Sequence, residues 1–220
     1  MGYLYGDRIV KIVLSKRVHA PVVKIGHSTI TIWNYLARRG IMKEISKKFV
    51  LSEQRMGMLL NEWKLWVDFY LPKYADKDTL IIDVGAGEGE TAVFFYLYGY
   101  KNFILIEKEP NQNIYQNAMA LTYLGCQVTV FLQPFNNVIF DKICSSGCED
   151  YYFKLDCEGC EKEFLKIYHP FEFSLELHSE AGRISDIIKM YGSRVLDFKE
   201  WKYGPHLVHV TPLREDDSTL

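Results

Sequence analysis

The stretch "LIIDVGAGEGET", residues 80–91, limits the possible folds of this chain more than any other stretch. Apolar residues typical of a buried strand run directly into three glycines, Gly85, Gly87 and Gly89. Glycine lets a backbone adopt unusual dihedral angles and approach a ligand closely. In open α/β sheets, ligands bind beyond the carboxyl ends of the strands. The stretch therefore predicts a strand, a ligand-binding turn and a following helix.

From residue 79 onward, strand patterns alternate with helix patterns. We expect strands at 79–83, 103–107, 127–132, 151–156, 172–178, 194–199 and 206–211. We expect helices at 89–98, 111–123, 160–167 and 183–191, and irregular chain at 133–150. Such alternation predicts an α/β fold with a doubly wound, mostly parallel, seven-stranded sheet that is covered on both faces.

The first 50 residues have a different pattern. Short strand patterns at 8–14, 20–25 and 28–33, then a possible short helix at 35–48, predict a small β-rich appendage over residues 1–50. Ser52 then precedes a helical apolar pattern at 53–71. We expect the ligand-binding domain to span 51–213 and the polar tail 214–220 to be flexible.

Charge and hydropathy exclude several classes of protein. The net charge of -2 shows no basic excess of the kind that accompanies non-specific nucleic-acid binding. The sequence has no apolar run of about 18 residues, which a membrane span would need. The first residues lack the pattern of a secretion signal, so we expect a cytoplasmic protein.

Four of the five cysteines lie in "CSSGCEDYYFKLDCEGC", at Cys144, Cys148, Cys157 and Cys160. Their spacing is unlike that of a zinc ribbon, so we expect plain thiols and no bound zinc. A disulfide and a zinc site are the two alternatives.

Two cofactor classes compete for the glycine turn. A dinucleotide site requires a glycine or another small residue where this chain has Glu90, and a carboxylate there would oppose a pyrophosphate. S-adenosylmethionine carries an ammonium and a sulfonium, which carboxylates such as Asp83 attract. Glu107, twenty residues after Gly87, can accept both ribose hydroxyls of a nucleoside. The pattern favours S-adenosylmethionine over the alternative, an ordinary strand-to-helix turn with a surface glutamate.

Two blocks carry a family resemblance. "DVGAGEGE" resembles the first motif of class I S-adenosylmethionine-dependent methyltransferases. "FKLDCEGCEKEFLK" at 153–166, followed by "FSLELHS" at 173–179, resembles the FkbM family, with its K-[IV]-D-x-E-G-x-E block. The similarity covers roughly residues 79–180, whereas residues 1–50 lie outside it and 133–150 depart from the family pattern.

The resemblance implies methyl transfer from S-adenosylmethionine, mainly to hydroxyls of sugars, polyketides and similar small molecules. The expected cofactor contacts are Asp83, Gly85, Ala86, Gly87, Gly89, Glu107, Lys108, Gln133 and Asp156. The alternatives are an RNA methyltransferase, with the N-terminal β region as an RNA platform and a locally basic segment at 37–48, and a cofactor-binding protein without catalysis. We expect a small-molecule partner and no nucleic acid.

Polar side chains recur on the strands at 151–156 and 172–178. Lys154 and Asp156 share one face of the first strand, and Glu176 and His178 share one face of the second. Because buried charges are costly unless paired, we expect a Lys154–Glu176 contact. Asp156 and His178 should then lie at the mouth of the site.

Three residues are the catalytic candidates: His178, Asp156 and Glu158. His178 is the expected general base, because the ordinary pKa of histidine lies near neutral pH. The alternative for His178 is a hydrogen-bonded residue at a strand end. Glu161, in a first helical turn, is expected to have a structural role. These carboxylates and the histidine could hold a divalent metal for a diol substrate, but their spacing does not require one and we expect none.

Overall fold

The structure is a computed structural model that describes residues 2–5, 8–15, 20–25, 28–109, 111–145, 147–148, 150–167, 169–178, 182–200 and 205–213. The expected flexible tail, 214–220, lies outside the described residues.

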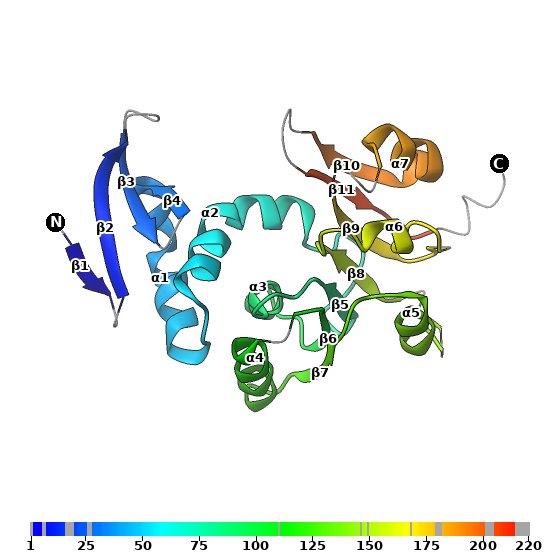
Figure 1. Ribbon diagram of the computed structural model, residues 1–220, viewed down its shortest axis with the longest axis horizontal. Helices are drawn as coiled ribbons and strands as arrows, with labels where there is room; N and C mark the ends of the chain where they lie inside the picture. The colour runs from blue at the N-terminus through cyan, green and yellow to red at the C-terminus, as the bar shows by residue number, and fades with distance from the viewer. Residues whose placement is uncertain are drawn as a thin grey trace.

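A seven-stranded sheet forms the centre of the molecule, in the order β10-β11-β9-β8-β5-β6-β7 (Figure 1). Its strands are β5 (Leu80–Val84), β6 (Asn102–Glu107), β7 (Gln127–Leu132), β8 (Tyr152–Leu155), β9 (Glu172–Leu177), β10 (Val195–Lys199) and β11 (His206–Val210). Strands β5 to β9 are parallel, whereas β11 runs antiparallel to β9 and β10 runs antiparallel to β11. The predicted α/β fold with a mostly parallel sheet is confirmed.

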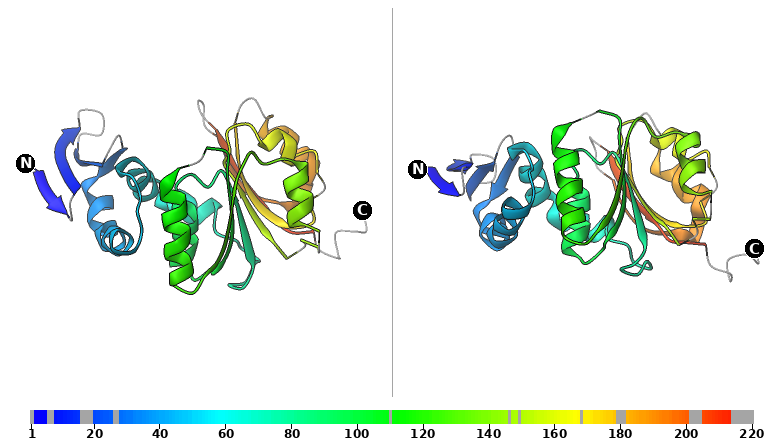
Figure 2. Two further views of the ribbon diagram at one scale, coloured as in Figure 1. Left: turned by 60° about the horizontal axis from the view of Figure 1, so that its bottom comes forward. Right: turned by 90° about the horizontal axis from the view of Figure 1, so that it is seen from below.

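Helices cover both faces of this sheet, as a doubly wound fold requires (Figure 2). On one face lie α2 (Glu53–Phe69), α3 (Glu90–Leu97) and α4 (Gln112–Tyr123); on the other lie α5 (Asn137–Ile143), α6 (Glu161–Phe164) and α7 (Ile184–Tyr191), which the 3-10 turn Gly192–Arg194 follows. Helix α5 lies within 133–150, where we expected irregular chain, so that prediction is wrong for these residues. None of the described helices is long and apolar enough to cross a bilayer.

The alternation of side chains along the strands divides the core in two. On β5, Ile81 packs into the cluster beneath α2, α3 and α4, whereas its neighbour Ile82 packs into the cluster beneath α5, α6 and α7. Both side chains are fully buried, as expected for a parallel strand that is covered on both faces. The same alternation turns Asp83 toward the α2 side and Val84 toward the α5 side.

The N-terminal segment forms its own antiparallel sheet, in the order β1-β2-β3-β4. Its elements are β1 (Gly2–Tyr5), β2 (Arg8–Ser15), β3 (Ala20–Ile25), β4 (Ser28–Thr31) and helix α1 (Ile32–Lys48). The strand expected at 28–33 ends at Thr31, where α1 begins, and β1 was not predicted. Ile30 of β4 and Ile45 of α1 are buried in the same cluster as Met56 of α2, so a shared apolar core joins the appendage to the main domain.

The chain reverses its direction across the sheet between β5 and β8. From β5 it continues to β6 and β7 on one side, and it then crosses to β8 and β9 on the other side. The turn after β5 and the loop after β8 therefore lie next to each other at the carboxyl edge. This is the switch point at which ligands bind in open α/β sheets.

Candidate active site at the switch point

The turn after β5 depends on its glycines. Gly85, Gly87 and Gly89 have φ angles of 78°, 57° and 85°, in the left-handed region that glycine tolerates best. A Cβ atom on Gly85 would lie 1.8 Å from the carbonyl oxygen of Asp156. The turn and the loop after β8 are thus in backbone contact, and a larger residue at position 85 would force them apart.

The backbone N–H groups of this turn already have acceptors within the protein. Each of residues 85–89 donates one hydrogen bond: Gly85 and Ala86 to the carbonyl of Ile106, Gly87 to the carboxylate of Glu107, Glu88 to that of Glu90, and Gly89 to the carbonyl of Ala86. A turn that cradles a phosphate instead directs its N–H groups at the ligand. The glycine turn is therefore not built to bind an anion.

Side chains from α2, from α4 and from the N-cap residue of α4 hold the glycine turn in place. Asn111 and Asn117 donate to the carbonyls of Gly87 and Glu88, each at 2.7 Å. Glu90, which is 2% exposed, forms an ion pair with Arg55 of α2 at 2.9 Å. Burial raises the pKa of Glu90 to about 7, although Arg55 opposes this shift. Sequence reasoning identified Glu90 as incompatible with a pyrophosphate but missed its partner on α2.

A cleft of about 520 Å³ opens between the turn and the loop after β8. Its described lining includes seven of the predicted site residues: Gly85, Gly87, Glu107, Lys108, Asp156, Glu158 and His178. Four other predicted residues lie outside this lining: Asp83, Ala86, Gly89 and Gln133. Sequence reasoning missed the contribution of α2, which supplies Arg55, Met58 and Glu62.

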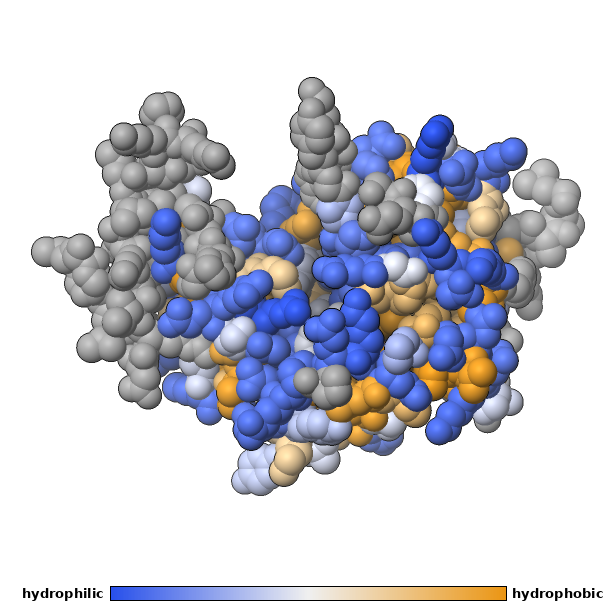
Figure 3. Space-filling view, viewed as in Figure 1, coloured by the Kyte–Doolittle hydropathy of each residue, from blue (hydrophilic) through white to orange (hydrophobic). Residues whose placement is uncertain are grey.

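Acidic residues predominate among the charged residues that line the cleft. Its carboxylates are those of Glu62, Glu107, Glu109, Asp156, Glu158, Glu163 and Glu176, against the basic side chains of Arg55, Lys108 and His178. Hydrophilic residues also predominate over the middle of the face seen in Figure 3. Carboxylates in a partly enclosed cleft attract a cationic ligand and repel an anionic one.

Beneath the cleft, Asp83 and Lys154 form a buried ion pair. The side chains are 0% and 1% exposed, and Lys154 Nζ lies 3.1 Å from Asp83 Oδ1. Burial opposes the charge of Lys154, but Asp83 and Asp156 outweigh burial and raise the pKa of this lysine. Burial likewise raises the pKa of Asp83, while Lys154 opposes that shift.

The predicted Lys154–Glu176 contact is wrong, and strand register is the reason. Lys154 stands opposite Asp83 on β5 and opposite Ser174 on β9, two residues before Glu176. The ammonium therefore pairs with Asp83 and lies 3.8 Å from Asp156, while Glu176 accepts a hydrogen bond from Tyr70, the C-cap residue of α2, at 2.8 Å. The sequence predicted correctly which side chains share a face but not which pairs stand opposite each other.

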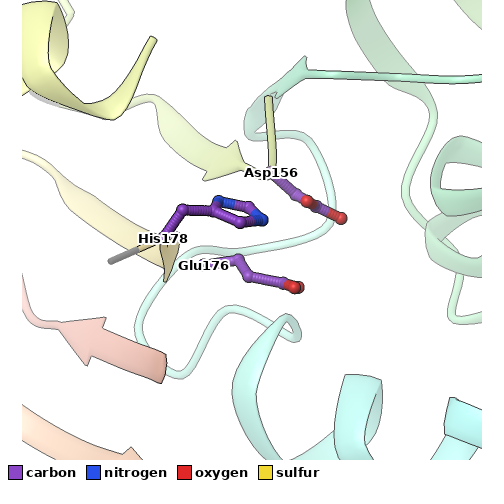
Figure 4. A group of neighbouring side chains, drawn as sticks. All are labelled: Asp156, Glu176 and His178. Atoms are coloured by element: carbon purple, nitrogen blue, oxygen red, sulfur yellow. The ribbon is translucent and has the colours of Figure 1, made fainter. Parts of the chain in front are cut away.

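Asp156, Glu176 and His178 come together at the ends of β8 and β9 (Figure 4). One potential ligand atom from each of the three lies within 4.8 Å of the others. Burial, together with the nearby charge of Asp156, raises the pKa of Glu176 to about 7. The expected meeting of Asp156 and His178 at the cleft is thus present in the structure, with Glu176 as a third member.

Glu161 determines the pKa of His178. Its carboxylate is fully buried and lies 2.8 Å from His178 Nδ1. The hydrogen bond to Glu161 raises the pKa of His178 to about 9, although partial burial opposes this shift. The expectation of a general base rested on an ordinary histidine pKa, and that reason does not apply to His178.

The loop that carries Asp156 and Glu158 is closed by a disulfide between Cys157 and Cys160, whose Cα atoms are 5.7 Å apart. The expectation of plain thiols is wrong for these two residues. The chain folds back at Glu158 and Gly159, both with positive φ, before α6 begins, and this turn brings the two cysteines together. The N–H of Gly159 also donates to Glu161 at 2.6 Å, so the loop is tied to the partner of His178.

Comparisons with known proteins give distant similarities. No protein-family model matches the sequence. "Uncharacterized protein 158B" of Sulfolobus islandicus rod-shaped virus 1 is 28% identical over 137 residues, which cover 57% of this chain and 78% of the viral protein.

Several similar solved structures are methyltransferases. An rRNA methylase from Streptococcus thermophilus has a TM-score of 0.40 at 16% identity, covering 64% of this chain and 90% of that one. The C-terminal domain of precorrin-6Y C5,15-methyltransferase from Rhodobacter capsulatus has a TM-score of 0.47 at 13% identity, covering 75% and 91%. TrmK of M. capricolum, solved with S-adenosyl-homocysteine, has a TM-score of 0.44 at 15% identity, covering 65% and 67%.

Proposed function

We propose that the chain is an S-adenosylmethionine-dependent methyltransferase of the FkbM type, and that its acceptor is a hydroxyl on a small molecule or sugar. The observation that carries this proposal is the glycine turn, whose N–H groups are committed to acceptors within the protein and which faces an acidic cleft. That environment suits a cationic nucleoside cofactor without phosphates and disfavours a dinucleotide. S-adenosylmethionine supplies an activated methyl group on a sulfonium.

Different residues of the cleft serve cofactor binding and methyl transfer. Glu107, at the end of β6, accepts the N–H groups of Gly87 and Glu109 at 2.8 and 2.9 Å and has further lone pairs for two ribose hydroxyls. Asp156 directly follows β8 and lines the same cleft as the glycine turn. There it can face the positive part of the cofactor. Asp156, Glu176 and His178 then hold the acceptor hydroxyl, and the two carboxylates are the groups that can assist loss of its proton.

The acidic lining also weighs against RNA as the acceptor. A phosphate backbone would approach Glu62, Glu158, Glu163 and Glu176 in the part of the cleft beyond the cofactor. Like charges so close together are unfavourable. A neutral hydroxyl-bearing molecule meets no such repulsion.

Titration calorimetry with S-adenosylhomocysteine tests the cofactor site. Glu107→Gln removes the charge but keeps one carbonyl oxygen for the turn, and we expect binding to weaken by about 1.5–3 kcal/mol. Glu109→Gln is the matched control, since this residue is exposed at the cleft mouth, and its affinity should change by less than about 0.5 kcal/mol. If the parent protein binds no S-adenosylhomocysteine, or if both variants bind like the parent, the assignment is wrong.

A further inference from the structure

The group Asp156, Glu176 and His178 has the composition of a metal site. We propose that it binds one hard divalent cation, Mg²⁺ or Mn²⁺, and that this cation positions an acceptor with two adjacent oxygen atoms. The second half of this inference rests on the proposed function, whereas the first half stands on the three side chains themselves. They reach one another from the ends of adjacent strands, with ligand atoms within 4.8 Å (Figure 4).

Glu161 prepares His178 to be a ligand. The buried carboxylate of Glu161 lies 2.8 Å from Nδ1, so Nδ1–H donates to it. In the neutral imidazole the lone pair then belongs to Nε2, at the tip of the ring on the side of Asp156 and Glu176 (Figure 4). A carboxylate that fixes the far nitrogen of a histidine is the usual support of a histidine that binds a metal.

The two carboxylates are held in the same way, each by a buried partner. Tyr70, which is 1% exposed, donates its hydroxyl hydrogen to Glu176 Oε2 at 2.8 Å. Lys154, which is also 1% exposed, lies 3.8 Å from Asp156 Oδ2. The second oxygen of each carboxylate is thus left for a cation. Each of the three ligands thus has a buried partner from another part of the chain or from the strand that precedes it, and for His178 and Glu176 this partner is hydrogen-bonded.

The ligand set indicates the class of cation. Two carboxylates and one neutral imidazole balance the charge of a divalent ion, and oxygen-rich sets suit Mg²⁺ and Mn²⁺. With bonds of about 2.1 Å, adjacent ligand atoms stand about 3 Å apart, so the side chains must close in slightly on the ion. Three protein ligands leave about three positions of an octahedral shell for other oxygens. A vicinal diol can occupy two of these positions.

Such a cation explains how the acceptor loses its proton although His178 is paired with Glu161. A bound divalent ion lowers the pKa of a hydroxyl that it contacts. The hydroxyl proton passes to solvent, and its oxygen forms the new bond to the methyl carbon. The sulfonium sulfur keeps the electron pair of the broken sulfur–methyl bond.

Manganese binding to chelator-treated, otherwise unaltered protein tests the site. Electron paramagnetic resonance should show one tightly bound Mn²⁺ per chain, and electron spin-echo modulation should show coupling to one imidazole nitrogen. Asp156→Asn, Glu176→Gln and His178→Gln should each weaken Mn²⁺ binding at least about tenfold. Glu163→Gln is the control: this carboxylate lies at the rim of the cleft and pairs with Lys166, so affinity should change less than about twofold.

Two results would overturn the inference: no saturable Mn²⁺ binding, or binding without the imidazole coupling. The spectroscopic result needs no variant, so it decides even if a substitution prevents folding. Calorimetry with S-adenosylhomocysteine on the metal-free protein separates this inference from the proposed function. Cofactor binding without Mn²⁺ binding would remove the metal and keep the methyltransferase, and Mn²⁺ binding without cofactor binding would do the reverse.

Discussion

Two histidine–glutamate pairs lie at opposite ends of β9, and they differ in what else they contact. His178 and Glu161 are 2.8 Å apart beside the cleft, and His209 and Glu172 are 2.7 Å apart between β9 and β11. The second pair is sealed, with His209 0% exposed, whereas the side chain of His178 is 22% exposed.

The sealed pair has its polar atoms satisfied. His209 Nδ1 donates to the carbonyl of Phe69 at 2.8 Å, and Glu172 accepts the N–H groups of residues 73–75. The His209–Glu172 pair therefore connects the end of α2 and the following loop to the sheet. In the other pair, Glu161 holds one nitrogen of His178, and the other nitrogen turns toward Asp156 and Glu176. The two pairs are chemically alike, but their roles differ. The difference lies in what the other imidazole nitrogen faces: a backbone carbonyl for His209, and two carboxylates at the cleft for His178.

Matched substitutions should separate the two pairs by their effect on stability. His209→Phe leaves Glu172 buried without its partner, so we expect the free energy of unfolding to fall by about 3–5 kcal/mol. His178→Phe leaves Glu161 beside the cleft, to which the partly exposed position 178 opens, and we expect a loss of about 1–2 kcal/mol. Urea denaturation followed by circular dichroism measures both. Equal losses, or a larger loss at His178, would contradict the distinction.

The Asp83–Lys154 pair offers an intermediate case, because it is sealed but lies directly beneath the cleft. Lys154→Met keeps the volume and leaves the buried Asp83 carboxylate without its cationic partner. We expect a loss of about 3 kcal/mol, the lower end for a broken buried pair, because Asp83 can take up a proton. Raising the pH from 6 to 8 should increase the loss, since that proton becomes harder to hold. A pH-independent loss would show that Asp83 does not titrate in the variant.

Much of this arrangement was predictable from local patterns. The apolar run in "LIIDV" and the glycines behind it sufficed for β5 and its turn, and Glu107 does contact Gly87. The strand and the turn depend on residues that are adjacent in the sequence. The Glu107–Gly87 contact depends on a spacing that one βαβ unit fixes. Helix α5 was missed because its seven residues are too short for a clear period, although Asn136 caps it.

Long-range register was not predictable. Whether Lys154 faces Asp83 or Glu176 depends on where β8 begins relative to β5 and β9, and a shift of two residues preserves every side-chain face. The same holds for Arg55, which reaches Glu90 from a helix 35 residues earlier. Glu161 looked like an ordinary acid in a first helical turn, since nothing local shows that His178 will lie against it. The chemistry of the site thus depends on the part of the fold that the sequence specifies least directly.

Another buried histidine, His169, has a tyrosine rather than a carboxylate as its partner, and it should respond to pH in the opposite sense to His178. It is 2% exposed, and Tyr191 donates its hydroxyl hydrogen to His169 Nδ1. Burial lowers the pKa of His169 to about 4. The unfolded chain, with an ordinary histidine pKa of about 6.5, binds this proton more readily than the folded protein. The stability linked to neutral His169 is therefore fully present above about pH 6.5 and is lost as the pH falls toward 4.

His169→Gln isolates this effect, because the amide oxygen still accepts from Tyr191 but does not titrate. Between pH 6 and pH 5 the parent should lose on the order of 1 kcal/mol more than the variant. Urea denaturation at the two pH values measures the difference, and Glu44→Gln, at an exposed surface position of α1, serves as a control for general acid effects. If the parent and His169→Gln lose stability in parallel, folding does not lower the pKa of His169. The inference that the neighbouring atoms of each histidine determine its pKa would then fail at His169.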